Sequence, residues 1–96
     1  MIWQLRTYTI KPGEMDGFLD LWRNWVVPAR ERLGFEIRGG WFDEQDGTFI
    51  WLVGHAAPDG WEAIERHYYE EGGRENFPRD PKDFLAQIET RLLSEA

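Results

Sequence analysis

The stretch that decides the fold reads Thr48-Phe49-Ile50-Trp51-Leu52-Val53-Gly54-His55. Side chains of a β-strand alternate between two faces, so Phe49, Trp51 and Val53 share one face. The other face carries Ile50 and Leu52. Both faces are apolar, which indicates that both are covered in the assembled protein. A chain of 96 residues has enough helix to cover only one of them. We therefore expect a second copy of the chain to cover the other.

The first third of the chain predicts a strand followed by a long helix. Residues 2–10 are rich in β-forming residues, and Lys11-Pro12-Gly13 ends the strand. Over residues 14–33, apolar side chains repeat with helical spacing within an arc of about 120°. Pro28 lies within this helix, where we expect a bend because proline has no amide hydrogen.

A β-hairpin is expected next. Residues 35–43 predict its first strand, in which Gly39-Gly40 indicates a bulge or a close approach by another group. Asp46-Gly47 is a typical hairpin turn and leads to the strand over residues 48–55. Together these residues predict two neighbouring antiparallel strands.

The last third predicts two helices and a strand. The first helix covers residues 61–71, and we expect Asp59 to cap it. Asp80-Pro81-Lys82-Asp83 is typical of a helix start and predicts a short helix that ends near Gln87. The final strand is expected over residues 88–93, where apolar and polar residues alternate.

The order of these elements predicts an α+β fold. Strand, helix, strand, strand, helix and strand form the ferredoxin-like split βαβ arrangement, with a four-stranded antiparallel sheet. The length fits one domain over residues 1–96. Helices cover one face of the sheet, and the other face is expected to meet its twin. The prediction is a homodimer built as a dimeric α+β barrel.

Composition excludes several kinds of partner. The formal net charge is −7, which argues against nucleic acid and against an anionic membrane surface. The chain has no Cys, and hence no disulfide and no thiolate site. We see no signal peptide and no run of 18 apolar residues, and we expect a cytoplasmic protein.

Several stretches resemble NIPSNAP-type domains. They are the opening Leu5-Arg6-Thr7-Tyr8-Thr9-Ile10-Lys11-Pro12-Gly13, the helix residues Phe18, Leu21-Trp22 and Pro28, the turn and strand Asp46-Gly47 and Phe49-Ile50-Trp51-Leu52, and the ending Ile88-Glu89-Thr90-Arg91-Leu92-Leu93. The resemblance spans nearly the whole chain. It implies membership of the dimeric α+β barrel superfamily and a homodimer formed through the sheets.

The resemblance also implies two classes of function. Superfamily relatives include cofactor-free quinone-forming monooxygenases, polyketide cyclases, haem-degrading enzymes and isomerases. Their reactions usually take place in a pocket between the sheet and the helices. The resemblance implies no settled activity, and the first expectation is a cofactor-free enzyme that acts on an aromatic or polyketide-like small molecule. The alternative is a non-catalytic small-molecule-binding or protein-interaction module, as eukaryotic family members suggest. Because function resides in sites rather than folds, the candidate residues matter most.

Arg6 and Tyr8 are the first candidate site residues. They share one face of the first strand with Gln4, and an arginine can bind a carboxylate through two hydrogen bonds. Their functional interpretation is a pocket that holds a substrate carboxylate or phenolate. The structural alternative is a polar network that fixes the dimer register, with Arg6 paired to Glu89 on the last strand.

His55, His67 and Tyr68 are the remaining catalytic candidates. Either histidine could act as a general base near neutral pH, while Tyr68 or Arg6 would stabilise a developing oxyanion. The structural alternatives are a hydrogen-bonded His55, a half-exposed His67 and a core Tyr68. Two histidines without a third ligand do not make a zinc site, so we expect no metal. Haem-degrading relatives use a helical His, which His67 could supply, but their first-strand Asn is missing here. We therefore expect no cofactor.

Tryptophan is the last class of candidate. The chain has six, and five of them are expected to wall a cavity for an aromatic substrate: Trp22, Trp25, Trp41, Trp51 and Trp61. The alternative for each is plain packing. Sequence motifs for phosphate binding and for zinc or serine hydrolysis are absent, and the only serine is Ser94.

Overall fold

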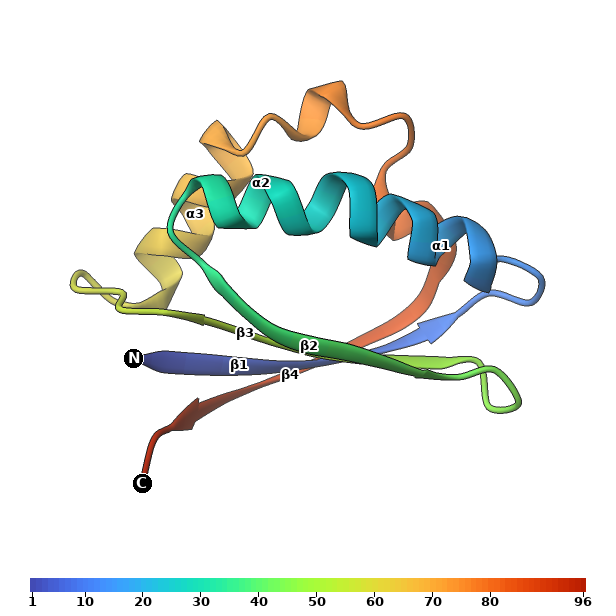
Figure 1. The fold of residues 1–96 in the computed structure, drawn as a ribbon, viewed down its shortest axis with the longest axis horizontal. Helices are drawn as coiled ribbons and strands as arrows, with labels where there is room; N and C mark the ends of the chain where they lie inside the picture. The colour runs from blue at the N-terminus through green and yellow to red at the C-terminus, as the bar shows by residue number, and fades with distance from the viewer.

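The computed structural model describes all 96 residues and has two layers, a sheet and a set of helices on one side of it (Figure 1). All strand pairs are antiparallel. The strands are β1 (Ile2–Ile10), β2 (Glu36–Asp43), β3 (Thr48–His55) and β4 (Leu85–Ser94), and their order in the sheet is β2-β3-β1-β4. This order confirms the predicted ferredoxin-like α+β fold.

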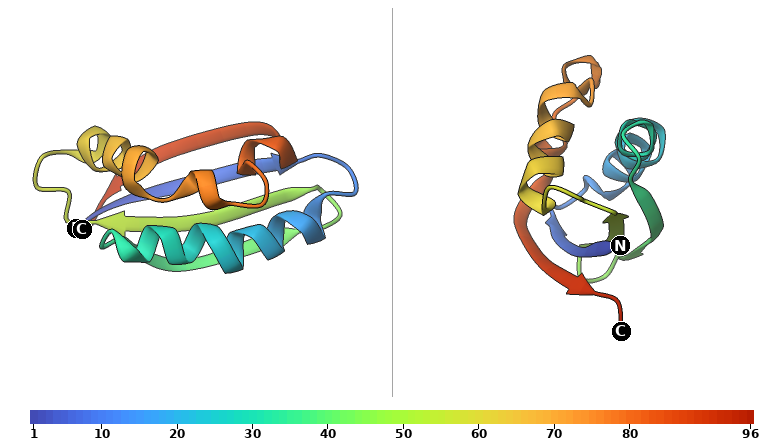
Figure 2. Two further views of the ribbon diagram at one scale, coloured as in Figure 1. Left: turned by 90° about the horizontal axis from the view of Figure 1, so that it is seen from above. Right: turned by 90° about the vertical axis from the view of Figure 1, so that its left-hand side faces the viewer.

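The helical layer consists of a long helix and a shorter one. The long helix is made of α1 (Met15–Leu21), a π-helical turn (Trp22–Val26) and α2 (Val27–Arg32), and the shorter helix is α3 (Trp61–Glu71). Figure 2 shows α1 and α2 along the β2 and β3 side of the sheet, with α3 on the β1 and β4 side. Two 3-10 turns, Arg74–Asn76 and Pro81–Phe84, connect α3 to β4. No helix has the length and apolar character needed to cross a membrane.

Pro28 is accommodated by the π-helical turn just before it, where the sequence predicted a bend. In a regular α-helix, Pro28 would leave one carbonyl of the preceding turn without its amide donor. The chain widens instead, and the Val27 amide bonds to the carbonyl of Trp22, five residues earlier. The helix continues through α2 without interruption.

The glycine pair in β2 has both of the properties that the sequence predicted. The register of β2 against β3 shifts between Ile37 and Gly39, which is a β-bulge. A Cβ atom added to Gly40 would lie 2.7 Å from Cη2 of Trp22 and 2.9 Å from Cζ of Phe49. Gly40 therefore lets the long helix approach the sheet closely.

Two element boundaries differ from the prediction. Asp59 does not cap α3, because Gly60 is the residue before the helix and no side chain caps it. Asp80 does cap the turn Pro81–Phe84, and its carboxylate accepts from the Lys82 amide at 3.0 Å. The helix expected to reach Gln87 ends with this turn, since Leu85 already pairs with β1.

The two faces of β3 are covered unequally. Phe49, Trp51 and Val53 are buried under the helices, each at most 1% exposed. On the opposite face Ile50 is 37% exposed, and Trp41 of β2, which lies opposite it, is 57% exposed. The helices of one chain thus cover a single face, as the sequence predicted.

Candidate functional site

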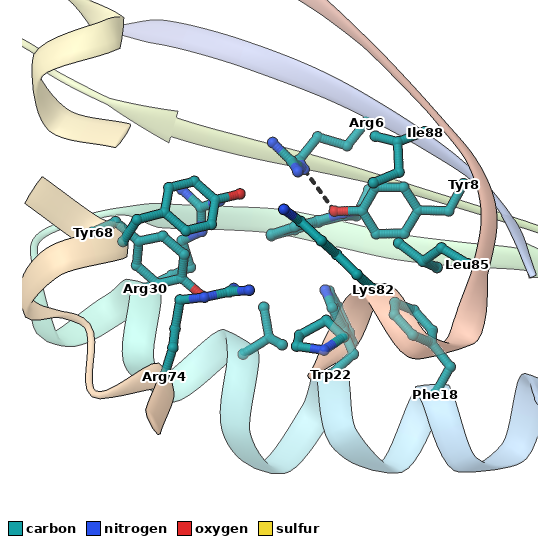
Figure 3. Close-up of a pocket in the computed structure, with 14 residues that line it drawn as sticks. Arg6, Tyr8, Phe18, Trp22, Arg30, Tyr68, Arg74, Lys82, Leu85 and Ile88 are labelled. Atoms are coloured by element: carbon teal, nitrogen blue, oxygen red, sulfur yellow. Dashed lines mark hydrogen bonds between the residues drawn. The ribbon is translucent and has the colours of Figure 1, made fainter. Parts of the chain in front are cut away.

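A pocket lies between the sheet and the helices, and six of the 14 residues that line it are aromatic (Figure 3). The enclosed cavity measures about 30 Å³ and opens into a recess of about 400 Å³ that includes space open to solvent. The aromatic residues of the wall are Tyr8, Phe18, Trp22, Trp51, Tyr68 and Tyr69. The cavity itself holds one or two water molecules, so a larger ligand requires side chains at the mouth to move.

Arg6 reaches the pocket from β1. Alternate β1 residues face the helices, so Arg6 lies between Gln4 and Tyr8 and is 7% exposed. Its Nε donates to the Tyr8 hydroxyl at 2.7 Å, and its Nη1 donates to Gln4 Oε1 at 2.6 Å. Burial lowers the pKa of Arg6, but the charge and hydrogen bond of Tyr8, with smaller effects of Tyr69 and Glu65, raise it by more. The net pKa lies above its usual value, and Arg6 is a permanent cation.

Arg30 supplies a second buried cation from α2. It is 2% exposed, and its guanidinium lies over the Tyr68 ring, 3.8 Å from the centroid. It donates a hydrogen bond to Oε1 of Glu65, and Oε2 of Glu65 lies 3.6 Å from Nη1 of Arg6. Two buried guanidinium groups therefore share one carboxylate, which leaves an excess of positive charge beside the aromatic wall.

Three N–H donors of pocket residues have no acceptor. They are Nε of Arg30 and the indole Nε1 of Trp22 and of Trp51, all buried. A buried donor without an acceptor costs about 1–3 kcal/mol. Oxygen acceptors of a bound molecule would satisfy these donors.

Two further cations lie at the mouth. Nη1 of Arg74 is 3.4 Å from the Tyr68 hydroxyl, and Nη2 is 3.6 Å from Asp80. Lys82 is exposed, and Figure 3 shows its side chain extended across the pocket between Tyr8 and Tyr68. The site thus combines four cationic side chains with two carboxylates, in a chain of formal net charge −7.

Tyr8 has the geometry of a hydrogen-bond donor to a ligand. Its oxygen accepts from Arg6, so its own hydrogen remains available for an oxygen atom in the pocket. A guanidinium behind a hydroxyl donor, in surroundings shielded from water, is an arrangement that stabilises an oxyanion.

The structure brings together five of the predicted site residues. Arg6, Tyr8, Tyr68, Trp22 and Trp51 all line the pocket. They come from β1, α3, the π-helical turn and β3, and only the tertiary fold makes them neighbours.

The two histidines lie elsewhere, in a separate shallow recess beside the start of α3. Nε2 of His55 is 3.0 Å from the carbonyl of Leu33, and Nδ1 accepts from the Ala57 amide at 2.9 Å. Both ring nitrogens of His55 are therefore used in holding the backbone. His67 is exposed and does not line the aromatic pocket.

The remaining three predicted tryptophans also lie outside the pocket. Trp25 is 39% exposed and packs on Phe77. Trp41 lies on the open face of the sheet, and Trp61 is buried in the core against Phe35. For Trp61 the plain-packing interpretation describes what the structure shows.

The expected ion pair between Arg6 and Glu89 is wrong. In the register of β1 and β4, Arg6 lies opposite Thr90, whereas Glu89 lies opposite Thr7 on the other face of the sheet. Arg6 meets Glu65 of α3 instead. Its polar network therefore faces the helices and the pocket, whereas a network that fixes the register of a sheet-to-sheet dimer requires the open face.

Four charged residues of the site were not predicted from the sequence: Arg30, Glu65, Arg74 and Lys82. A signal for Arg30 was present, since Trp22, Val26 and Arg30 follow one another at intervals of four residues, on one helix face. Arg74 and Lys82 come from the irregular segment after α3, where periodicity carries no information. No three His, Asp or Glu side chains come together in a way that could hold a metal ion.

Comparison with known proteins supports the fold. A sequence model of the NIPSNAP family matches residues 3–94. An uncharacterized NIPSNAP domain protein from Burkholderia xenovorans is similar, with 17% identity, a TM-score of 0.82 and coverage of 100% of this chain and 95% of that chain. A NIPSNAP family protein from Agrobacterium tumefaciens is also similar, with 21% identity and a TM-score of 0.81. The match covers 99% of this chain and 92% of that chain.

A more distant structure is that of an antibiotic biosynthesis monooxygenase. Its identity is 19%, its TM-score is 0.69, and the match covers 100% of this chain and 99% of that chain. At such identities, the likeness to all three structures shows the fold alone. No curated protein matches the sequence.

Proposed function

The chain belongs to the NIPSNAP family, and from this premise we propose that its pocket binds a small aromatic or polyketide-like anion and acts on it without a cofactor. Function in this fold depends on the site rather than on the family. The proposal therefore rests on the pocket between sheet and helices, and on the residues that line it.

The observation that carries the proposal is the shared carboxylate of Glu65. Arg6 and Arg30 are both buried, and they have only this one acidic partner. An uncompensated buried charge is unfavourable by several kcal/mol. A bound anion offsets that cost, and the surrounding tyrosine and tryptophan rings favour a flat, apolar body for the same ligand.

The same groups favour reactions that pass through an enolate or phenolate. Arg6 and Tyr8 stabilise an ionised oxygen, which lowers the pKa of a bound enol or phenol. Glu65 is engaged by two arginines and is a poor general base. The pocket therefore suits a substrate that ionises readily, and isomerisation, cyclisation and oxygenation of such ions, the last with molecular oxygen as co-substrate and oxidant, form the proposed reaction class.

A non-catalytic binding module is the second candidate. It is favoured by the same observation, since the pocket has strong binding groups but no uncommitted base among its buried residues. The two candidates share the ligand and differ only in turnover.

We also propose that the protein is a homodimer joined through the open face of the sheet. That face exposes the apolar side chains Trp41, Ile50 and Leu93. Its recess at β4 carries both Glu89 and Arg91, so two copies related by a twofold axis can pair opposite charges.

The test uses 2-naphthoate as a binding probe and ethyl 2-naphthoylacetate as an enolisable one. In calorimetry, Arg6→Gln should weaken 2-naphthoate binding at least tenfold, and Arg66→Gln, an exposed arginine of α3, should leave it unchanged. Proton NMR in D2O then follows hydrogen exchange at the α-carbon of the keto ester. Acceleration that depends on Arg6 supports the enzyme, binding without acceleration supports the binding module, and absence of binding contradicts both.

A further inference from the structure

We propose that the pocket has a second anion subsite at its mouth, formed by Arg74 and Lys82, and that its ligand is an aromatic acid with a carboxylate at one end and an ionisable hydroxyl at the other. The inference rests on the proposed function, because it assigns the inner end of the same ligand to Arg6 and Tyr8.

Arg74 is available to a ligand because its only acidic partner is weak. Asp80 lies 3.6 Å away and its side chain is 57% exposed, so water screens the pair. The Arg74 side chain is 18% exposed, and its guanidinium lies over the ring of Tyr69, 4.7 Å from the centroid. The aromatic contact holds the guanidinium at the mouth while leaving hydrogen-bond donors for an anion.

Lys82 is positioned by the backbone and has no acidic partner. Its amide donates to Asp80 at 3.0 Å, and Pro81 fixes the turn before it. No carboxylate lies within 4.0 Å of its ammonium group. Asp80 thus accepts from the Lys82 backbone and lies beside the Arg74 side chain, so both cations of this subsite are near one edge of the pocket.

The unpartnered donors give independent support for an oxygen-rich ligand. The Arg30 side chain is only 2% exposed, yet its Nε has no hydrogen-bond acceptor. The indole Nε1 atoms of Trp22 and Trp51 are also buried without an acceptor. The Trp22 and Trp51 rings meet edge to face at 5.8 Å and belong to the apolar wall. A rigid ring against this wall places its substituents toward the two charged ends.

The different burial of the two subsites assigns the two ends of the ligand. Arg6 is buried and is joined to the Tyr8 hydroxyl, which suits an oxygen whose charge is delocalised into a ring. Arg74 and Lys82 lie at the mouth, where a carboxylate keeps part of its hydration. With two excess positive charges over the whole site, a ligand that carries two negative charges neutralises it.

The experiment compares 6-hydroxy-2-naphthoate with its methyl ester, which keeps the hydroxyl and loses the carboxylate charge. Calorimetry measures both against the unmodified protein, Lys82→Met and Arg74→Met. The control is Lys11→Met, which removes the only other lysine of the chain. We expect the acid to bind at least tenfold more tightly than the ester. Lys82→Met should reduce this ratio three- to tenfold without changing the Kd of the ester, and Lys11→Met should leave both affinities unchanged.

The outcomes separate the two proposals. If acid and ester bind with equal Kd, or if Lys82→Met weakens both equally, the outer subsite is wrong and the inner anion site stands. If neither probe binds, the outer subsite and the proposed function are both wrong. A reduced ratio in Lys82→Met or Arg74→Met with normal melting temperature supports the subsite, because loss of folding would weaken both probes alike.

Discussion

A single carboxylate, that of Glu65, lies between the two buried arginines of the site. Glu65 accepts from Arg30 and lies 3.6 Å from Arg6, and its side chain is only 16% exposed. A buried ion pair contributes little net stability while it is intact, but removal of one partner is strongly destabilising. Because two cations share one anion, removal of the Glu65 charge leaves both arginines without an acidic partner and is expected to destabilise the fold.

Glu65→Gln should lower the free energy of unfolding by about 2–4 kcal/mol, somewhat less than for a fully buried pair, because it leaves two buried cations without an acid. Glu70→Gln changes an exposed residue of the same helix and should alter stability by less than about 0.5 kcal/mol. Urea denaturation measures both. Equal effects of the two substitutions would contradict the role of Glu65.

Gly40 offers a second residue-level prediction, with its neighbour as the control. An added methyl group at Gly40 meets the rings of Trp22 and Phe49, which the core holds in place, so Gly40→Ala should destabilise by about 1–3 kcal/mol. At Gly39 the methyl group meets only the ring of Trp41, which is exposed and can move aside. Gly39→Ala should therefore destabilise the protein much less than Gly40→Ala. Thermal unfolding of the two variants measures the difference.

At the scale of elements, the irregular segments build the pocket. The π-helical turn contributes Trp22 and Val26, and the segment after α3 contributes Arg74 and Lys82. The sheet supplies the floor, which includes Arg6 and Tyr8 of β1 and Trp51 of β3. A π-helical turn inside an α-helix is rare and frequently marks a functional site. Here the turn accommodates Pro28 in the backbone, and its side chains Trp22 and Val26 form part of the pocket wall.

The segment between α3 and β4 can be tested through Asp80. Asp80→Asn keeps an oxygen for the Lys82 amide but removes the negative charge beside Arg74. The pocket should become more positive, and 2-naphthoate should bind about two- to fivefold more tightly, as expected for an exposed ion pair. Asp83→Asn, an exposed acid of the same segment, is the control in the same calorimetric assay. Weaker binding to Asp80→Asn would contradict this account.

At the scale of the whole molecule, the two faces of the sheet differ in what they contact. One face packs under the helices and forms the pocket, while the other exposes apolar side chains that include Ile50 and Trp41. Arg6 and its hydrogen-bonded partners lie wholly on the helix side of the sheet, so substitutions on the open face leave these pocket contacts in place.

Ile50→Lys should convert the proposed dimer to a monomer, because it places two charges in a desolvated interface. Trp25→Lys changes a similarly exposed apolar residue on the helical layer and should leave the dimer intact. Sedimentation measures the mass of each variant. A monomeric unmodified protein, or a dimeric Ile50→Lys, would contradict the sheet-to-sheet interface.

Binding of 2-naphthoate should be nearly independent of pH between 6 and 9. The pKa of Arg6 is raised, and a raised pKa keeps the cation at every pH below it, so Arg6 stays charged throughout this range. Affinity should fall only as the probe itself becomes protonated at acidic pH. An affinity that follows a pKa near 6.5 would instead indicate a histidine, and would return His55 and His67 to the site.

Local sequence patterns predicted the elements, their order and the two faces of the strand at residues 48–55. Alternation in residues 48–55 and helical spacing in residues 14–33 are local properties, and both were confirmed. The topology followed from the element order. Trp51 was also identified, because strand alternation places it on the same face as Phe49 and Val53. Alternation likewise grouped Arg6 with Tyr8, but it did not show which face of the sheet they share.

Which polar groups meet depends on how distant segments of the chain pack against one another. The partner of Arg6 depends on the register of β4 and on the packing of α3, and a shift of one residue in β4 exchanges its faces. Arg74 and Lys82 come from a segment without periodicity. The convergence of four cations on one aromatic pocket is a long-range property, set by how the layers pack, and no local pattern encodes it.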